Sequence, residues 1–123
     1  DIDNFKTIND KYGHPAGDKV LSKTAEIISS NIREEDKAAR WGGDEFLILT
    51  TSTTLVQGKQ VAEKIRKTIK TLSITDGSQK IAVSLTIGVT AFDGDDELNT
   101  IIARADTALY EGKQGGRNCV VAK

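Results

Sequence analysis

Apolar residues recur along the chain at two spacings, one typical of helices and the other typical of strands. Three segments carry apolar residues at every third or fourth position and predict helices: 18–33, 56–72 and 98–109. Residues 81–89 alternate apolar side chains with small or polar ones, which predicts a long half-buried strand. Helices and strands that follow one another in this way indicate an α/β arrangement.

Shorter segments complete this order. Residues 1–3 are predicted to form the end of a strand whose body lies upstream. A helical turn begins at Phe5 and is expected to stop in the polar stretch 9–17, which contains two glycines and a proline. Asp18 is then the expected N-cap of the first long helix. Residues 118–122 are predicted to form a last short strand.

Length and composition set the bounds of the domain. The chain has 123 residues, so we expect residues 1–123 to form one α/β domain with a modest core. We predict a central mixed sheet flanked by helices, with the first strand missing or truncated upstream of Asp1. A formal net charge of −1 provides no basic field, which argues against a nucleic-acid partner. One cysteine, Cys119, excludes an internal disulfide and favours a cytoplasmic domain, whether or not the full-length protein is membrane-anchored.

Two segments predicted as strands, 38–41 and 46–51, enclose a turn in which two glycines precede two acids, Asp44 and Glu45. This order predicts a β-hairpin with carboxylates at its tip. Paired glycines permit a positive φ and leave room for a ligand beside the backbone. Carboxylate oxygens suit a divalent cation that accompanies a polyphosphate. The alternative is an ordinary turn with solvated acids, and the turn alone leaves both interpretations open.

The stretch Gly42-Gly43-Asp44-Glu45-Phe46 resembles the signature of the GGDEF domain family, the diguanylate cyclases of bacterial signalling. The resemblance covers the whole chain in order, which makes it far more specific than the signature alone. Its further blocks are Asp1 to Lys6, Asn9 to His14, Gly17 and Asp18, Ser84 to Val89, Arg104 to Asp106, Ala108 to Tyr110, Lys113, and Gly116 to Asn118.

The resemblance implies a fold, a reaction and partners. The fold is the palm-like fold of nucleotide cyclases, in a domain that begins before the equivalent of Asp1. Family members condense two GTP molecules into cyclic di-GMP and release two pyrophosphates. They work as homodimers in which each subunit holds one GTP, with Mg²⁺ or alternatively Mn²⁺ as cofactor. An upstream sensor or receiver domain is the expected means of bringing two subunits together.

The resemblance also assigns the metal and catalytic residues. The carboxylates of Asp1 and Asp44 and the carbonyl of Ile2 are expected to hold the metal ion. Asp44 and Glu45 are the catalytic candidates, with Asp44 also a candidate for activating the attacking hydroxyl. This agrees with the preference of Mg²⁺ for one or two carboxylates together with phosphate oxygens and water. A strand end and a neighbouring hairpin can bring Asp1 and Asp44 together.

Asn9 and Asp18 match the residues that read the guanine base in the family. An aspartate accepts hydrogen bonds from the N1–H and N2–H₂ groups of guanine, and an asparagine can both donate and accept. The presence of Asp18 favours GTP over ATP. The local alternatives are a turn residue for Asn9 and an N-cap for Asp18.

Lys113 and Arg117 match the residues that bind the outer phosphates, as arginine and lysine commonly do. The alternative for both is ordinary basic residues at a helix C-terminus. Backbone N–H groups at the start of a helix bind anions well. The remaining residues expected to surround the phosphates are therefore Gly43, Asn4, Phe5 and Lys6.

Arg33 and Asp36 form an RxxD pattern at the spacing of the family's inhibitory product site. In that site the arginine binds a guanine of cyclic di-GMP and the aspartate binds a guanine edge. Either Lys64 or Arg66 is a candidate for a further cation there. The alternative is an ordinary polar helix end.

His14, the sole histidine, is expected to order its loop rather than exchange protons. Two functions remain open at this point. The first is a diguanylate cyclase, which the intact stretch Gly42 to Phe46 favours. The second is a binding module that senses GTP or cyclic di-GMP without turnover.

Overall fold

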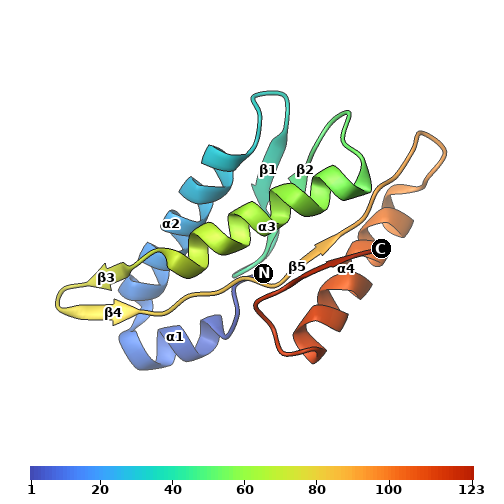
Figure 1. The fold of residues 1–123 in the computed structure, drawn as a ribbon. Helices are drawn as coiled ribbons and strands as arrows, with labels where there is room; N and C mark the ends of the chain where they lie inside the picture. The colour runs from blue at the N-terminus through green and yellow to red at the C-terminus, as the bar shows by residue number, and fades with distance from the viewer.

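The computed structural model describes residues 1–123 as four helices arranged around three two-stranded sheets (Figure 1). The helices are α1 (Phe5–Tyr12), α2 (His14–Asn31), α3 (Leu55–Thr71) and α4 (Leu98–Gln114). The strands are β1 (Lys37–Arg40), β2 (Phe46–Leu49), β3 (Ile74–Asp76), β4 (Gln79–Ile81), β5 (Ile87–Val89) and β6 (Val120–Ala122). These elements confirm the predicted α/β class. None of the four helices has both the length and the apolar composition that a membrane crossing requires.

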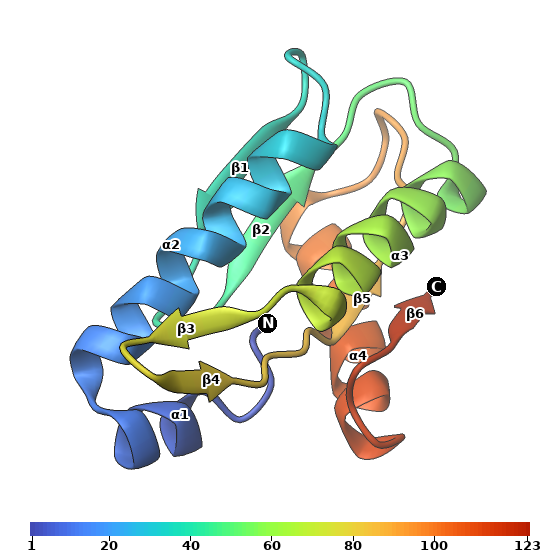
Figure 2. The same cartoon turned by 60° about the vertical axis from the view of Figure 1, so that its left-hand side comes forward.

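Helices α3 and α4 cover opposite faces of β5. A Cβ added to Gly58 of α3 would come within 3.3 Å of the Val89 side chain, whereas one added to Gly88 would meet the backbone of Ala105 and Leu109 in α4. Successive residues of a strand point to opposite faces, so the two helices lie on opposite sides. Helix α2 packs beside α3, and Figure 2 shows α2 in front of the β1–β2 hairpin and α3 in front of β5.

The core between these layers is built from aliphatic side chains. Helix α3 buries Ile65 and Ile69, and the segment after β3 buries every second residue from Ile81 through Val83 to Leu85. Both spacings are the ones that the apolar pattern predicts. The full cluster comprises Ile2, Ile8, Ala16, Val20, Leu21, Ile27, Ile28, Ile65, Ile69, Ile74, Ile81, Val83 and Leu85.

The predicted strand 81–89 is divided in the structure. Its last part, β5, pairs in parallel with β6, while residues 84–86 pair with residues 1–3. The backbone N–H of Asp3, for example, donates to the carbonyl of Ser84 at 3.0 Å. Burial alternates from Ile81 to Leu85 and then stops, since Thr86 is also buried. The pairing partner of the segment changes as well, and the partner decides where a regular strand begins and ends. The expected central sheet is therefore present as short pieces.

The connection between α1 and α2 is shorter than predicted. The expected break within 9–17 shrinks to Gly13, which adopts a φ of 89° between the two helices. Pro15 lies in the first turn of α2, where a missing N–H costs no hydrogen bond. Asp18 therefore lies inside α2, and its predicted role as N-cap is wrong.

Helix α4 extends beyond its predicted end near Leu109 and passes through Gly112. A Cβ at Gly112 would lie 2.6 Å from the methyl carbon of Thr86 and 3.1 Å from the sulfur of Cys119. This glycine lies within the helix and does not end it. It lets α4 approach the sheet closely.

A turn at Asp76 and Gly77 joins two three-residue strands, β3 and β4, that the apolar pattern does not reveal. Gly77 has a φ of 62°, which a glycine adopts without strain. Each strand buries a single isoleucine, Ile74 or Ile81, and one apolar residue shows no periodicity.

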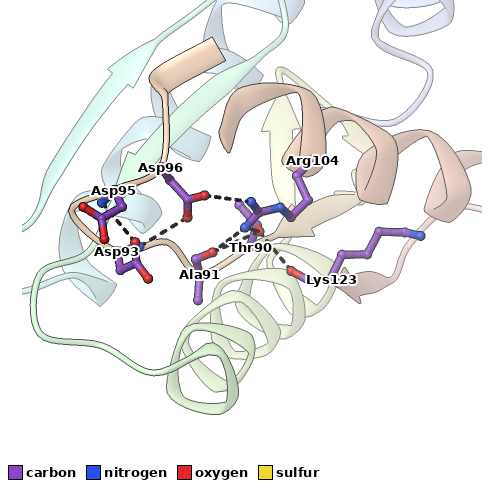
Figure 3. A network of polar contacts seen from close by, with 7 residues as sticks. All are labelled: Thr90, Ala91, Asp93, Asp95, Asp96, Arg104 and Lys123. Carbon is purple, nitrogen blue, oxygen red and sulfur yellow. Dashed lines mark hydrogen bonds and ion pairs between the residues drawn. The ribbon is translucent and has the colours of Figure 1, made fainter. Parts of the chain in front are cut away.

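The acidic loop between β5 and α4 is attached to the helix through Arg104 (Figure 3). The Arg104 guanidinium donates to the carbonyl of Ala91 at 2.8 Å and to the carboxylate of Asp96 at 3.3 Å. The same carboxylate accepts the backbone N–H of Asp93 at 3.3 Å. These contacts show that Arg104 and the loop acids hold the loop in place beside the helix.

Candidate active site

A pocket opens where α1, the start of α2 and the tip of the β1–β2 hairpin meet. Its volume is about 380 Å³. Nine residues line it: Phe5, Lys6, Asn9, His14, Asp18, Leu21, Arg40, Gly43 and Asp44. Six of these nine residues are predicted from the sequence to bind substrate or metal: Phe5, Lys6, Asn9, Asp18, Gly43 and Asp44. The fold thus brings residues from three separate segments to one place.

The base-reading candidates, Asn9 and Asp18, come from the two helices on one side of this pocket. Asp18 is exposed on α2, whereas Oδ1 of Asn9 is buried and has no hydrogen-bond partner. A buried acceptor without a partner costs about 1–3 kcal/mol. Such a group calls for an explanation, and a ligand or water that supplies the missing hydrogen bond is one.

Helix α1 presents its N-terminus to the same pocket. Asn4, its N-cap, has the left-handed angles φ 53° and ψ 37°, and its side chain caps no N–H group of the helix. The N–H groups of the first helical turn have no partner within a helix. Phe5 and Lys6 of that turn line the pocket, so donors for a phosphate group are in place.

The hairpin tip closes on the backbone carbonyl of Glu45. This carbonyl accepts the N–H of Trp41 at 2.8 Å and that of Gly42 at 3.3 Å. Neither glycine of the turn has a positive φ, so that part of the predicted reason for glycine is wrong. A Cβ at Gly42 would lie 2.9 Å from the Glu45 carboxylate, whereas a Cβ at Gly43 would meet no protein atom within 4 Å. Gly42 makes room for Glu45, and Gly43 faces open space.

Arg40, the last residue of β1, lines the pocket but was not identified from the sequence. Its Nε donates to the carbonyl of Gly42 at 3.1 Å and its Nη2 to the carbonyl of Gly43 at 2.8 Å. The carbonyl and the N–H of a trans peptide point in opposite directions. By holding the two carbonyls, Arg40 also fixes the direction of the N–H groups of Gly43 and Asp44. The sequence feature that could have revealed it is an arginine two residues before the Gly-Gly pair.

Asp1 and Lys113 form an ion pair next to the hairpin tip. Nζ of Lys113 lies 3.2 Å from Oδ1 of Asp1, whose side chain is only 6% exposed. The backbone N–H of Ile2 donates to the carbonyl of Asp44 at 3.0 Å. The structure therefore places the predicted metal residues beside one another and beside one predicted phosphate-binding lysine.

The electrostatics at Asp1 show how closely the acids gather. The carboxylates of Asp3, Asp44 and Glu45 lie close enough to the start of residue 1 for their charges to act there, opposite in sign to the charge of Lys113. Together with the Asp1 carboxylate they make a negative region around one lysine, and such a region favours a bound cation.

The residues fit a magnesium ion that arrives with its nucleotide. Among residues 1–123, no group of three or more His, Cys, Asp or Glu side chains is arranged to hold a metal ion. The predicted ligands are two carboxylates, Asp1 and Asp44, and the carbonyl of Ile2, whose oxygen takes part in no backbone hydrogen bond. Mg²⁺ is commonly held by one or two carboxylates and completes its shell with phosphate oxygens and water.

Asp3 is a further acid of this region to which the sequence analysis gave no role. Its carboxylate accepts the hydroxyls of Ser84 at 2.7 Å and Thr86 at 2.6 Å and the backbone N–H of Asn118 at 3.0 Å. These bonds fasten the start of the chain to the sheet and to the segment after α4, and they hold the neighbouring Asp1 in place. The sequence feature that could have revealed this role is the pair of small hydroxyl residues, Ser84 and Thr86, on one face of the predicted strand, which an acid can join by hydrogen bonds.

Arg117, like Asn4 and Lys113, is a predicted phosphate residue that does not line the pocket. It is exposed in the tight turn after α4, where it has a φ of 64° and its N–H donates to the carbonyl of Gly112 at 3.0 Å. Its side chain lies at the surface, while Lys113 of the same segment contacts Asp1.

The predicted inhibitory pair, Arg33 and Asp36, lies beyond the other end of α2. The Asp36 carboxylate accepts the backbone N–H of Arg33 at 2.9 Å and the backbone N–H of Thr51 at 3.1 Å. The hydrogen bond from the Arg33 N–H is the main reason that the pKa of Asp36 lies below its usual value. The bond from Thr51 lowers the pKa further, whereas burial raises it. The Arg33 guanidinium remains exposed and donates to the carbonyl of Thr51 and the hydroxyl of Thr53.

Of the two further cations considered for that site, Arg66 is already engaged. Its guanidinium donates to Oδ1 of Asn118 at 3.0 Å and to the Glu63 carboxylate at 2.9 Å. Lys64 is exposed on the same helix. Lys64 is therefore the candidate that still presents its charge to solvent.

Comparison with known proteins gives consistent matches along the chain. A family model described as diguanylate cyclase, GGDEF domain, matches residues 1–119. Diguanylate cyclase A of Treponema denticola is 49% identical over 121 residues, which cover 98% of this chain and 33% of that protein. Response regulator PleD of Caulobacter vibrioides is 39% identical over 126 residues, which cover 100% of this chain and 28% of that protein.

The fold matches equally well. The crystal structure of the GGDEF domain of DgcB from Caulobacter crescentus, in complex with cyclic di-GMP, has a TM-score of 0.94 at 32% identity. The match covers 99% of this chain and 73% of that one. The predicted palm-like cyclase fold is thereby confirmed. The chain spans only a third or less of the two curated relatives described above.

Proposed function

The chain belongs to the GGDEF diguanylate cyclase family, and we propose that it condenses two GTP molecules into cyclic di-GMP with release of two pyrophosphates. The observation that carries the proposal is the pocket that joins Asn9 and Asp18 to Asp44. It combines polar side chains that suit a guanine, N–H groups that suit phosphates, and an acid beside a second acid and a lysine.

Each group has a part in binding GTP. The carboxylate of Asp18 accepts from the N1–H and N2–H₂ groups of guanine, and Asn9 supplies a second contact to the base. The N–H groups at the start of α1 and at Gly43 surround the phosphates. Lys113 and the exposed Arg117 neutralise the outer phosphates.

Mg²⁺, or alternatively Mn²⁺, would be held by Asp1, Asp44 and the carbonyl of Ile2, and it would neutralise phosphate charge and polarise the α-phosphate. The 3′-hydroxyl of a GTP on a facing subunit attacks the α-phosphorus, and the bond to the bridging oxygen breaks to release pyrophosphate. The hydroxyl proton passes to a carboxylate of the hairpin, Asp44 or Glu45. The second half-site forms the second bond in the same way, so the active species is a homodimer.

Control of this dimer is expected to come from outside residues 1–123. An upstream sensor or receiver domain would bring two copies together, and the relative named as a response regulator supports that arrangement. Analysis of the products tests the reaction itself. The protein, incubated with GTP and Mg²⁺, should form one cyclic di-GMP for every two pyrophosphates. Pyrophosphate without cyclic di-GMP would overturn the proposal.

Replacing Arg40 with lysine should weaken GTP binding while the fold persists. Lysine keeps the charge but cannot donate the two parallel bonds that hold the Gly42 and Gly43 carbonyls. We expect about tenfold weaker binding, the effect of one or two lost hydrogen bonds. Calorimetric titration with GTP measures it, and Lys37→Ala at the exposed start of β1 is the control. Equal affinity of Arg40→Lys and the unaltered protein for GTP would show that the contacts of Arg40 with the two carbonyls do not affect GTP binding.

We further propose that cyclic di-GMP inhibits the enzyme by binding at Arg33 and Asp36. The exposed Arg33 guanidinium would contact the product, with Lys64 as a further surface cation. The buried Asp36 carboxylate would mainly hold Arg33 in place, because both of its oxygens already accept backbone N–H groups. Arg33→Ala should therefore abolish product inhibition, and unchanged inhibition in that variant would refute the assignment.

Asp36 should also make stability depend on pH. Because its pKa is lowered in the folded state, its contribution is fully present above the unfolded pKa of about 3.9 and is lost as the pH falls through the folded pKa. Asp36→Asn should be less stable at neutral pH and should lose less stability on acidification. Thermal unfolding measured from neutral pH to below the pKa of an ordinary aspartate tests this. Parallel curves for the two proteins would contradict it.

A further inference from the structure

Gly17 occupies a helical position that normally favours alanine. It is buried within α2, where its φ is negative, so the backbone itself does not require glycine. Glycine inside a helix is destabilising by about 1 kcal/mol relative to alanine. The reason for glycine must therefore be the space beside it. A Cβ at this position would lie 1.8 Å from Oδ1 of Asn9, 3.0 Å from its Cγ, and 3.3 Å from the ring of Phe5.

The carboxamide of Asn9 thus fills the place that a side chain at residue 17 would take. Its Oδ1 is buried against Gly17 and has no hydrogen-bond partner. Oxygen and nitrogen lie on opposite sides of a carboxamide, so this position turns Nδ2 and its two N–H donors away from Gly17. Asn9 lines the pocket, which is where those donors are available to a ligand.

We propose that Gly17 is a positioning residue that selects guanine over adenine by fixing the orientation of the Asn9 carboxamide. This inference rests on the proposed function, because it requires a purine base in this pocket. Guanine carries an acceptor, O6, where adenine carries an N6–H₂ donor. A carboxamide held with Nδ2 toward the base donates to O6 and has nothing to offer the adenine amine. A carboxamide free to turn over would accept from that amine and tolerate adenine.

Asp18 and the Asn9 carboxamide that lies against Gly17 then bind different groups of the base. Asp18 is an acceptor and suits the N1–H and N2–H₂ donors of guanine, whereas Asn9 supplies the donor for O6. Hypoxanthine keeps O6 and N1–H but lacks the 2-amino group. A defect in Asn9 should therefore affect guanine and hypoxanthine nucleotides equally, which separates it from a defect in Asp18.

The experiment is a double-mutant cycle of Gly17→Ala and Asn9→Ala. Binding of 3′-deoxy forms of GTP, ITP and ATP, which cannot be condensed, is measured for all four proteins. Gly17→Ala should weaken the guanine and hypoxanthine nucleotides by the same factor, roughly tenfold, and leave the adenine nucleotide unaffected or bound more tightly. With Asn9 already replaced, Gly17→Ala should cause no further loss, because the two residues act through one contact.

The outcomes separate this inference from the function on which it rests. If the unaltered protein shows no preference among the three bases, or if Asn9→Ala changes nothing, the proposed base site is wrong. If Asn9→Ala weakens binding but Gly17→Ala does not, or if their effects add, only the positioning role of Gly17 is overturned. An equal loss for all three nucleotides in Gly17→Ala would also overturn it.

Stability provides a second readout. With Asn9 shortened, Gly17→Ala should raise the thermal midpoint by a few degrees, because the gain in helix propensity is no longer opposed by the clash. This double variant also covers the case in which Gly17→Ala alone fails to fold. Failure of both to fold would overturn the inference, since the conflict would then not lie with Asn9. Gly58→Ala, at a helical glycine of α3 outside the pocket, is the control and should leave the base preference unchanged.

Discussion

Replacing Asp44 with alanine is expected to abolish cyclic di-GMP formation while the protein still folds. In the proposed mechanism the variant loses one of the two carboxylates that would hold the metal ion and one candidate acceptor for the hydroxyl proton. Each of these effects is worth several kcal/mol at the transition state, so the rate should fall about a thousandfold or more. The turnover of GTP measures the loss. The contact that joins the hairpin to Ile2 uses the backbone carbonyl of Asp44, which alanine retains.

Two comparisons make this result specific. Thermal unfolding of Asp44→Ala should match that of the unaltered protein, which excludes misfolding as the cause. Asp106→Ala removes an exposed acid of α4 that takes part in no ion pair, and it should retain full activity. Near-normal turnover in Asp44→Ala would contradict the placement of the reaction at the hairpin tip.

Replacing Asp3 with alanine is expected to cause the largest loss of stability of any change considered. The substitution removes the acceptor for three donors: the hydroxyls of Ser84 and Thr86 and the N–H of Asn118. Asp3 is 6% exposed and Thr86 is fully buried, so the donors left behind have little access to water. We expect a loss of roughly 3 kcal/mol or more, since unsatisfied buried groups cost about 1–3 kcal/mol each. Urea unfolding, followed by circular dichroism, measures it.

Ser84→Ala is the matched control for that measurement. It removes one donor and leaves the Asp3 carboxylate with its other two bonds, so its cost should be about 1 kcal/mol. If Asp3→Ala were no more destabilising than Ser84→Ala, the carboxylate would not be the anchor of the start of the chain. In that case the fixed position of Asp1 would need another explanation.

Features that depend on local spacing could be predicted from the sequence. The three long helices follow from apolar residues three or four apart. Most residues of the pocket were singled out from the sequence because the family blocks are short and occur in order. Six of the nine pocket residues were assigned in this way.

Features that depend on contacts across the fold could not be predicted. Nothing in the local sequence shows that Oδ1 of Asn9 fills the space above Gly17, and so Gly17 looked like a helix breaker. The strand predicted at 81–89 is divided because residues 1–3 pair with only part of it. Asp18 looked like a helix start because Pro15 was taken as a break, although a proline in the first turn is compatible with a helix. Asp3 was overlooked because its partners lie far away in the chain.

The dependence of activity on protein concentration shows whether this pocket is half of a site that a second copy of the protein completes. Cyclic di-GMP formation with GTP and Mg²⁺ is measured while the oligomeric state is followed by light scattering. The account predicts that the rate per molecule rises with concentration as dimers form. GTP binding without any cyclic di-GMP in a dimeric sample would instead indicate a binding module. A rate per molecule that is independent of concentration in a monomeric sample would contradict the claim.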